Sequence, residues 1–394
     1  MAKIHNFDEP INRIGTDSFK WDYEGEDGKY IPLGVADTDF KVPQEAIDAV
    51  RKRVDFGVYA YGDIGHVMPR FTDAITGWYG RRYGVKVAPE EICYSMGLMT
   101  GALWMSVNAF TRPGDQILIM APVYHTFSIV IKGMGRFPVS SDLILNDGHY
   151  EIDFENLEKM ASSPQVRCLL ICNPHNPVGR VWTKEELEKV AAICKKTNTL
   201  IISDEIHGDI VYGDNKLTSL LTIEDARDNL VVMGSPSKTF NLAALYCAYV
   251  VIPNKALRDQ YSVVFEDYHT DYNYLGIEAL IACYNECDYY VDQQNEYFWK
   301  NITLVKNFIK ETMPEVKVIE PEGTYLMWID FRAWNLPQEQ LIQMFKDAGV
   351  KLNSGSNYGA PGTGFVRLNV ATQTAVLEEA LAKMGEAYRK FKAE

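Results

Sequence analysis

Residues 230–241 read Leu230-Val231-Val232-Met233-Gly234-Ser235-Pro236-Ser237-Lys238-Thr239-Phe240-Asn241, and this is the most informative stretch of the chain. Its apolar run, residues 230–233, is typical of a buried strand. Two small hydroxyl residues, Ser235 and Ser237, then precede Lys238. A lysine that forms a Schiff base with a carbonyl cofactor needs this arrangement, because its amine must be held beside a site for an anion. The pattern also occurs in ordinary turns, so its meaning depends on the rest of the chain.

An acid upstream offers a second group of such a site. Asp204 follows the apolar run at residues 199–202 and therefore lies at the carboxyl end of a predicted strand. Open α/β sheets expose their chemistry at that end. There Asp204 can bond the pyridine nitrogen of pyridoxal phosphate (PLP), so that the ring accepts electrons from a substrate carbanion. The alternative is an acid that caps a helix or lies in a loop.

Three further segments supply the remaining parts of a PLP site. Asn173, in a turn fixed by two Asn-Pro pairs and Gly179, can offer an amide donor to the phenolic oxygen of PLP. Gly97 opens a predicted apolar helix that runs through Phe110, and free amides at a helix N-terminus bind phosphate. Arg367 can bind an α-carboxylate with both prongs of its guanidinium, although a single arginine on a strand is usually a surface residue.

Taken together and in this order, the segments resemble the fold-type I PLP enzymes, the aspartate aminotransferase superfamily, over nearly the whole chain. The chain is more similar still to the cystathionine β-lyase (MalY/PatB) branch, the C–S lyases. The motifs that carry this second resemblance are Phe19-Lys20-Trp21-Asp22, Val35-Ala36-Asp37-Thr38-Asp39-Phe40, Asn173 through Gly179 with Arg180-Val181-Trp182, Ser237-Lys238-Thr239-Phe240-Asn241, Gly323-Thr324-Tyr325-Leu326 and Arg367-Leu368-Asn369.

The resemblance implies a role for each matching residue around the cofactor ring. Lys238 is the catalytic residue and forms the Schiff base with PLP. Asp204 pairs with the pyridine nitrogen, and Asn173 donates to the ring oxygen. Tyr124 stacks on the ring, and His207 stands at the position beside the ring oxygen.

The resemblance also implies how phosphate and substrate are held. Arg367 binds the substrate carboxylate with help from the backbone near Ala36. Tyr61 reaches into the active site of a partner subunit, so a homodimer with composite sites is expected. The phosphate is expected to be held by Gly97, Leu98, Met99, Ser235 and Ser237.

Four positions depart from common patterns of the superfamily. His207 stands where many aminotransferases place a tyrosine, and the lyase branch also carries histidine there, which favours a lyase. Tyr246 stands where many aminotransferases place an arginine that binds phosphate, so the phosphate charge is less neutralised here. Gly34 replaces a tryptophan common in the branch, and Met96 replaces a proline. These two changes indicate an altered substrate preference.

Composition limits the possible partners. The net charge of −14 disfavours nucleic acid and anionic membranes, although it does not exclude a small anionic substrate. There is no signal-like apolar segment at the N-terminus and no apolar run long enough to cross a bilayer. The seven cysteines lack Cys-x-x-Cys spacing, and the seven histidines lack metal-ligand spacing. We therefore expect a cytoplasmic protein with reduced thiols, no metal, and a small amino acid as substrate.

Strands and helices alternate along the chain, which predicts an α/β fold with a mainly parallel sheet covered on both faces. A capping box at residues 183–186 predicts a helix to about Lys196. No glycine fingerprint for a dinucleotide follows a strand. We expect an N-terminal segment (1–45) that packs with a small C-terminal α/β domain (291–394), and a large PLP-binding domain (46–290) between them.

Three functions remain open at this stage. The favoured one is a C–S β-lyase that cleaves cystathionine, cysteine or a cysteine S-conjugate to thiol, pyruvate and ammonia. The second is a class I/II aminotransferase that uses a keto-acid acceptor. The third is a PLP protein whose main role is regulatory, through binding to another protein.

Overall fold

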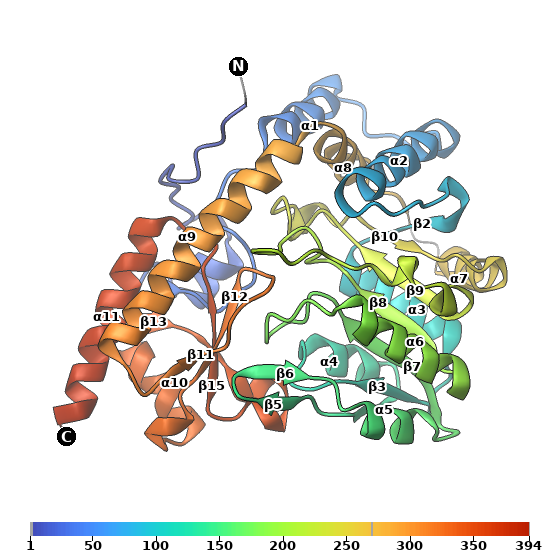
Figure 1. Ribbon diagram of the computed structural model, residues 1–394. Coiled ribbons are helices and arrows are strands. Elements are labelled where there is room, and N and C mark those ends of the chain that lie inside the picture. The colour runs from blue at the N-terminus through green and yellow to red at the C-terminus, as the bar shows by residue number, and fades with distance from the viewer. Residues whose placement is uncertain (1–2, 269–270, 394) are drawn as a thin grey trace.

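A seven-stranded sheet forms the centre of the computed structural model, which describes residues 3–268 and 271–393 (Figure 1). Neighbouring strands run parallel from β9 to β4, whereas β10 is antiparallel to both of its neighbours. The sheet is therefore mixed but mainly parallel, as the sequence predicts. Its strands in spatial order are β2 (Ile92–Ser95), β10 (Ala248–Val251), β9 (Leu230–Gly234), β8 (Leu200–Asp204), β7 (Val166–Cys172), β3 (Gln116–Ile119) and β4 (Phe137–Ser140).

Successive side chains of the central strands enter two different hydrophobic cores. Leu169 of β7 packs in the same core as Leu187 of α6, whereas its neighbour Leu170 packs in a second core with Tyr261 of α7. Because side chains alternate between the faces of a strand, helices cover both faces of this sheet. The helices around it are α1 (Gln44–Phe56), α2 (Ile64–Trp78), α3 (Trp104–Phe110), α4 (Thr126–Gly133), α5 (Phe154–Ala161), α6 (Lys184–Thr197), α7 (Lys255–Asp267) and α8 (Tyr274–Glu286).

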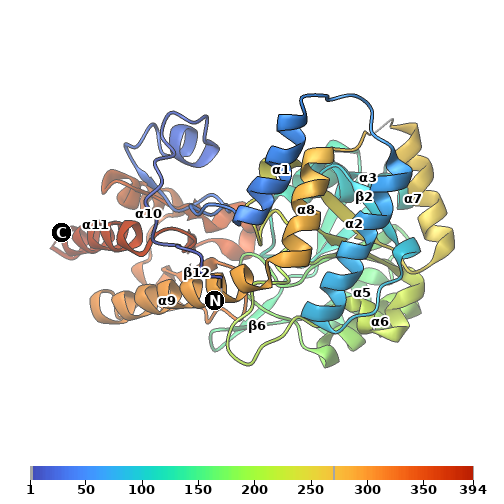
Figure 2. The ribbon, with the colours of Figure 1, turned by 90° about the horizontal axis from the view of Figure 1, so that it is seen from above.

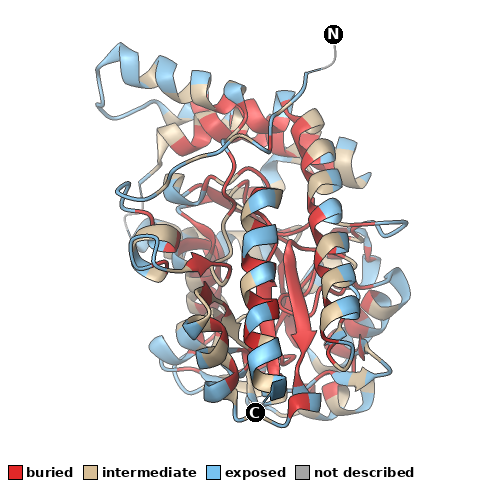
Figure 3. Ribbon diagram, turned by 90° about the vertical axis from the view of Figure 1, so that its left-hand side faces the viewer, coloured by how far each residue is buried: buried red, intermediate tan, exposed pale blue. Residues whose placement is uncertain are grey.

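A smaller unit is built on a four-stranded antiparallel sheet. Its helices are exposed on their outer sides, and buried strands lie behind them (Figure 3). None of the helices in the described ranges is long and apolar enough to span a membrane. The elements of this unit are β11 (Lys317–Val318), β12 (Leu326–Asp330), β15 (Phe365–Asn369) and β14 (Asn353–Ser354), with α9 (Asp288–Thr312), α10 (Gln338–Asp347) and α11 (Thr374–Ala393); a hairpin of β5 (Ile144–Asn146) and β6 (His149–Glu151) stands apart.

The N-terminal segment lies against this smaller unit (Figure 2). Its strand β1 (Ile31–Pro32) pairs in parallel with β13 (Val350–Lys351), and a single turn of helix at Phe19–Glu24 precedes β1. The expected domain boundary at residues 290–291 falls near the start of α9, which continues into the smaller unit. The division into 1–45, 46–290 and 291–394 stays a prediction, and residues 1–2 and 394 lie outside the described ranges.

Candidate active site

The carboxyl ends of three adjacent parallel strands meet at one edge of the large sheet. Asp204 is the last residue of β8, and the strand register aligns it with Cys172 of β7 and Met233 of β9. Ser235 and Lys238 follow β9 directly. Groups that are far apart in the sequence therefore share one site, at the place where open α/β sheets bind ligands.

Two adjoining cavities open there, and Lys238 lines both of them. The inner cavity has a volume of about 190 Å³. The outer cavity has a volume of about 550 Å³ and is lined by Arg367 as well as by Ala36, Tyr124 and Lys238. The residues expected at the site that line the inner cavity are Ala36, Gly97, Leu98, Met99, Tyr124, Asp204, His207, Ser235, Ser237 and Lys238.

The amine of Lys238 is held by a backbone carbonyl from the N-terminal segment. Lys238 Nζ donates a hydrogen bond of 2.6 Å to the Ala36 carbonyl oxygen. The Tyr325 hydroxyl donates to the same oxygen at 3.0 Å. Desolvation lowers the pKa of Lys238 to about 8, because the low-dielectric surroundings disfavour the charged ammonium. A neutral, nucleophilic amine is therefore accessible near neutral pH.

Two buried groups face the inner cavity with unused bonding capacity. Burial raises the pKa of Asp204 to about 7, although its Oδ1 accepts a bond from the Ile206 amide at 3.1 Å. Burial, with the cations Lys238 and Arg367 nearby, holds the pKa of His207 well below its usual range, so its imidazole is neutral. His207 Nδ1 has no hydrogen-bond partner among the described residues. A protonated ring nitrogen and a ring oxygen are the kinds of group that would satisfy these two side chains.

Another part of the lining of the inner cavity suits an anion. Gly97 has a φ of +82° and precedes the helical turns Leu98–Leu103, whose first amides lack intrahelical partners. A Cβ atom at Gly97 would lie 3.1 Å from Thr100 Oγ1 and 3.3 Å from the Tyr246 ring, so a side chain here would crowd this end of the cavity. Lys238 is the only cation among the described residues that line this cavity, so a phosphate would be held mainly by neutral donors.

Arg367 is fixed in orientation before any ligand binds. It comes from β15 and is buried, and Nη1 donates to Asn176 Oδ1 at 3.1 Å while Nη2 donates to the Gly34 carbonyl at 2.6 Å. Its guanidinium lies 5.1 Å from the centre of the Tyr358 ring. Its Nε has no partner among the described residues. The fork is thus pre-oriented toward the outer cavity for a carboxylate.

Two sequence-predicted residues do not line these cavities. Asn173 Nδ2 donates to the Thr218 carbonyl at 2.9 Å, and its Oδ1 accepts from the Trp182 amide, so both ends of this amide are already bonded within the protein. This disagrees with a role for Asn173 at the ring oxygen. Asn176 lines the inner cavity instead, and the second Asn-Pro pair of the same turn was its sequence signal. Tyr61 is fully exposed and lines a separate surface hollow.

Residues 34–40 include Ala36, whose carbonyl accepts the hydrogen bond from Lys238. Three side chains form hydrogen bonds with the backbone of this segment. Asn369 Nδ2 donates to the carbonyls of residues 35 and 37 at 2.6 and 2.7 Å. Asn241 both donates to and accepts from the backbone of Thr38. Gln373 Nε2 donates to the Asp39 carbonyl at 2.7 Å. Since Asn241 and Asn369 lie close in sequence to Lys238 and Arg367, the segment is tied to both functional side chains.

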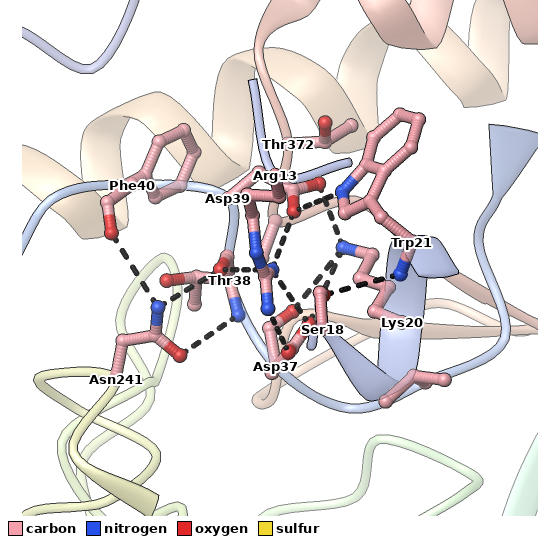
Figure 4. Close-up of polar contacts among 12 residues, drawn as sticks. Arg13, Ser18, Lys20, Trp21, Asp37, Thr38, Asp39, Phe40, Asn241 and Thr372 are labelled. Carbon is pink, nitrogen blue, oxygen red and sulfur yellow. Dashed lines mark hydrogen bonds and ion pairs between the residues drawn. The ribbon is translucent and has the colours of Figure 1, made fainter. Parts of the chain in front are cut away.

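A buried ion cluster, which we call the Asp39 cluster, anchors the same segment (Figure 4). Asp39 is 2% exposed and accepts bonds from Lys20 Nζ at 2.8 Å, Trp21 Nε1 at 2.8 Å and Arg13 Nη1 at 2.7 Å. Arg13 also pairs with Asp37 at 2.8 Å. Burial opposes the ionisation of Asp39, but Lys20 and its other partners outweigh burial and lower its pKa. The negative charge of Asp39 in the folded state keeps Lys20, which is completely buried, in an ion pair.

The chemistry of the donor set fits PLP. The inner cavity is lined by the carboxyl group of Asp204, by His207 with its unpartnered Nδ1 and by the start of a helix, and Lys238, with its lowered pKa, lines both cavities. Among the described residues, no group of three or more His, Cys, Asp or Glu side chains could hold a metal ion. The arrangement can therefore bind a phosphorylated aldehyde in the inner cavity and an amino acid in the outer one.

Comparison with known proteins agrees with this geometry. Residues 28–384 match the family described as aminotransferase class I and II. The chain is 37% identical over 385 residues to cystathionine beta-lyase PatB of Bacillus subtilis, which covers 96% of this chain and 98% of that protein. The structure of cystalysin from Treponema denticola, which contains pyridoxal 5'-phosphate, is 32% identical with a TM-score of 0.94 and covers 98% and 100% of the two chains. The PLP-bound C-S lyase from Staphylococcus hominis is 29% identical with a TM-score of 0.91 and covers 98% of each chain.

The lowered pKa of Lys238 predicts how the cofactor-free protein takes up PLP. Only the neutral amine attacks the aldehyde, so the rate of covalent attachment should rise about tenfold per pH unit below pH 8 and level off above it. The measurement is the absorbance of bound PLP after rapid mixing at a series of pH values, with Lys238→Ala as a control that forms no bond. A rate that keeps rising toward pH 10.5, the ordinary value for lysine, would contradict the role of burial.

The Asp39 cluster predicts a stability effect. Asp39→Ala leaves the buried ammonium of Lys20 without its closest partner, so we expect a loss of about 3–5 kcal/mol in the free energy of unfolding. The matched control is Asp259→Ala, which breaks the exposed pair with Lys255 on α7 and should cost below about 1 kcal/mol. Urea denaturation of the cofactor-free proteins measures both. Equal, small losses in the two variants would show that the cluster does not anchor the segment.

Proposed function

Because the chain belongs to the class I and II aminotransferase family, and within it to the PLP-dependent cystathionine β-lyase branch, we propose that it is a C–S β-lyase. The proposed substrates are cystathionine, cysteine or a cysteine S-conjugate, which react with water to give thiol, pyruvate and ammonia. The observation that carries the proposal is the position of Lys238, a residue that lines both the inner and the outer cavity. One amine can therefore attach the cofactor and reach the substrate.

When bound in the inner cavity, PLP supplies an electron sink for the negative charge that develops at the substrate α-carbon. Lys238 Nζ takes up the proton from that carbon, a task that its pKa of about 8 suits because the neutral amine is well populated near neutral pH. Loss of this proton allows the bond between the β-carbon and sulfur to break, with its electron pair leaving on sulfur. The Ala36 carbonyl fixes the position of Nζ through the 2.6 Å hydrogen bond.

The remaining side chains bind and orient. Arg367 binds the α-carboxylate in the outer cavity, where its pre-oriented guanidinium gives two-pronged recognition. Asp204 would hold the ring nitrogen of PLP, whose positive charge would offset the burial of the carboxylate. Tyr124 lines both cavities and would hold the ring between them. Asn176 takes the role at the ring oxygen that was expected of Asn173, because its Oδ1 is fixed by Arg367 and its Nδ2 stays available.

We also propose that the enzyme is a cytoplasmic homodimer. All seven cysteines are free thiols, as expected for a reducing compartment. Large apolar side chains are exposed at the end of α1 and in the segment after it, including Phe56, Val58 and Tyr59, which are 60–72% exposed. A contact between two copies of the chain would cover them and would bring Tyr61 to the partner's cavities.

The proposed function predicts pyruvate release without an acceptor. L-cystathionine or a cysteine S-conjugate should yield pyruvate, ammonia and thiol in equal amounts when no keto acid is present. The measurement is steady-state pyruvate formation over a panel of thioether amino acids, with Lys238→Ala as the control, which should lose about 10²–10⁴-fold in rate. The alternative is transamination: if pyruvate never appears while 2-oxoglutarate supports conversion of an amino acid to its keto acid, the lyase proposal is wrong.

The proposed dimer predicts complementation between two inactive chains. In a dimer of Lys238→Ala with Tyr61→Ala, one site keeps both Lys238 of its own chain and Tyr61 of the other. Each mixed dimer should then have about half of full activity, because one of its two sites is intact. Activity is measured after purification through two different affinity tags. A fully active monomer in light scattering, or mixed dimers without activity, would exclude a composite site.

A further inference from the structure

We propose that Glu24 and Lys351 form a subsite for the distal group of a substrate that carries an amino-acid group at each end. Both residues line the outer cavity, together with Arg367, which binds the first carboxylate. This inference rests on the proposed lyase function and names its substrate class: zwitterionic thioethers, of which cystathionine is an example. The distal carboxylate would pair with Lys351 and the distal ammonium with Glu24.

Glu24 and Lys351 form an ion pair that is partly exposed rather than buried. Lys351 Nζ lies 2.7 Å from Glu24 Oε2, and each side chain is 28% exposed. Glu24 ends the helical turn of the N-terminal segment, and Lys351 ends β13. A partly exposed ion pair of this kind contributes little stability, so its members can exchange partners at low cost. A ligand that is itself a zwitterion offers each of them an equivalent partner.

Strand register places Lys351 at a suitable distance from Arg367. Asn353 of β14 pairs directly with Arg367 of β15, so the two side chains share one face of the sheet. Lys351 lies two residues before Asn353 in extended chain and therefore points to the same side. Two residues along a strand and one step across it put the Cα atoms of Lys351 and Arg367 roughly 8 Å apart. A thioether chain of a few bonds can bridge the two charged ends.

The wall of the outer cavity fits the rest of such a ligand. Apolar side chains line the cavity, and these can receive methylene and thioether groups: Phe19, Pro32, Ile342 and Leu352. Gly34 also lines it, and a Cβ atom there would lie 3.3 Å from the Asn353 amide nitrogen, so this part of the wall is formed closely by backbone. A cavity with charged groups of both signs and an apolar wall favours a long zwitterion over a short, uncharged side chain.

The chain offers a matched control for a merely structural role. Lys346 of α10 pairs with Glu26 at 3.4 Å, so this second ion pair ties the same N-terminal segment to the smaller unit. Neither Lys346 nor Glu26 lines the outer cavity. If the Glu24–Lys351 pair only joined the two segments, then Lys346→Met and Lys351→Met should have similar effects. If the pair binds substrate, only Lys351→Met should alter selectivity.

The test is calorimetric binding to the PLP-loaded enzyme, which does not require C–S cleavage. The probe is L,L-2,7-diaminosuberate, the analogue of cystathionine with a methylene in place of sulfur, and the reference is L-norleucine, which has one amino-acid group. We expect Lys351→Met to weaken diaminosuberate binding about tenfold and Glu24→Gln to weaken it similarly, because each removes one charge-assisted contact. Norleucine binding should change less than twofold in both variants, which also shows that the variants fold.

Equal losses for both ligands, no loss for either, or the same effect from Lys346→Met would overturn the subsite. Kinetics give a second readout, since kcat/KM should fall about tenfold for L-cystathionine and stay within twofold for S-ethyl-L-cysteine. The two proposals fail in distinguishable ways. An enzyme that never releases pyruvate but loses diaminosuberate affinity in Lys351→Met keeps the subsite and loses the lyase function.

Discussion

The hydrogen bond from Lys238 Nζ to the Ala36 carbonyl joins the parts of the molecule on which the site depends. Lys238 follows a strand of the large sheet, whereas Ala36 belongs to a segment whose strand pairs with the smaller unit. Amide side chains close in sequence to Lys238 and Arg367 donate hydrogen bonds to backbone carbonyls of that segment. The ion pairs of the Asp39 cluster hold the same segment through the Asp39 side chain. The position of one amine therefore depends on contacts spread over the whole fold.

Burial then sets the charge state of each group around that amine. Desolvation lowers the pKa of Lys238 to about 8 and raises that of Asp204 to about 7. Near pH 7, a larger fraction of each group is therefore neutral than would be neutral in water. His207 stays neutral for the same reason. Arg367 remains a cation and is oriented by neutral acceptors, which leaves its charge for a ligand. The inner cavity thus suits a cationic ring nitrogen and the outer cavity a carboxylate.

Much of this could be predicted from the sequence, because strand ends and helix starts are local signals. The run before Lys238, the acid at the end of β8 and the capping box at Thr183 each depend on a few neighbouring residues, and the structure has the predicted elements there. Asn173 and Asn176 could not be told apart in this way. Which amide faces the cavity is decided by partners distant in sequence, such as the Thr218 carbonyl, which occupies Asn173.

Sequence patterns also cannot predict which backbone groups and long-range ion pairs form the site. The carbonyls of Gly34 and Ala36 act through their position, not their side chains, and Tyr325 joins them from the smaller unit. Lysine and aspartate side chains are almost always exposed, yet Lys20 and Asp39 are both buried. Only the folded chain brings such groups together, since their positions result from the packing of the N-terminal segment between the two units.

We propose that one amine, that of Lys238, attaches the cofactor where the two cavities adjoin. The most direct measurement is reduction of the PLP-loaded enzyme with borohydride, followed by mass spectrometry of its peptides. We expect the reduced cofactor to be fixed on the peptide that contains Lys238, and no label to remain after the same treatment of Lys238→Ala. A label on any other lysine would contradict it.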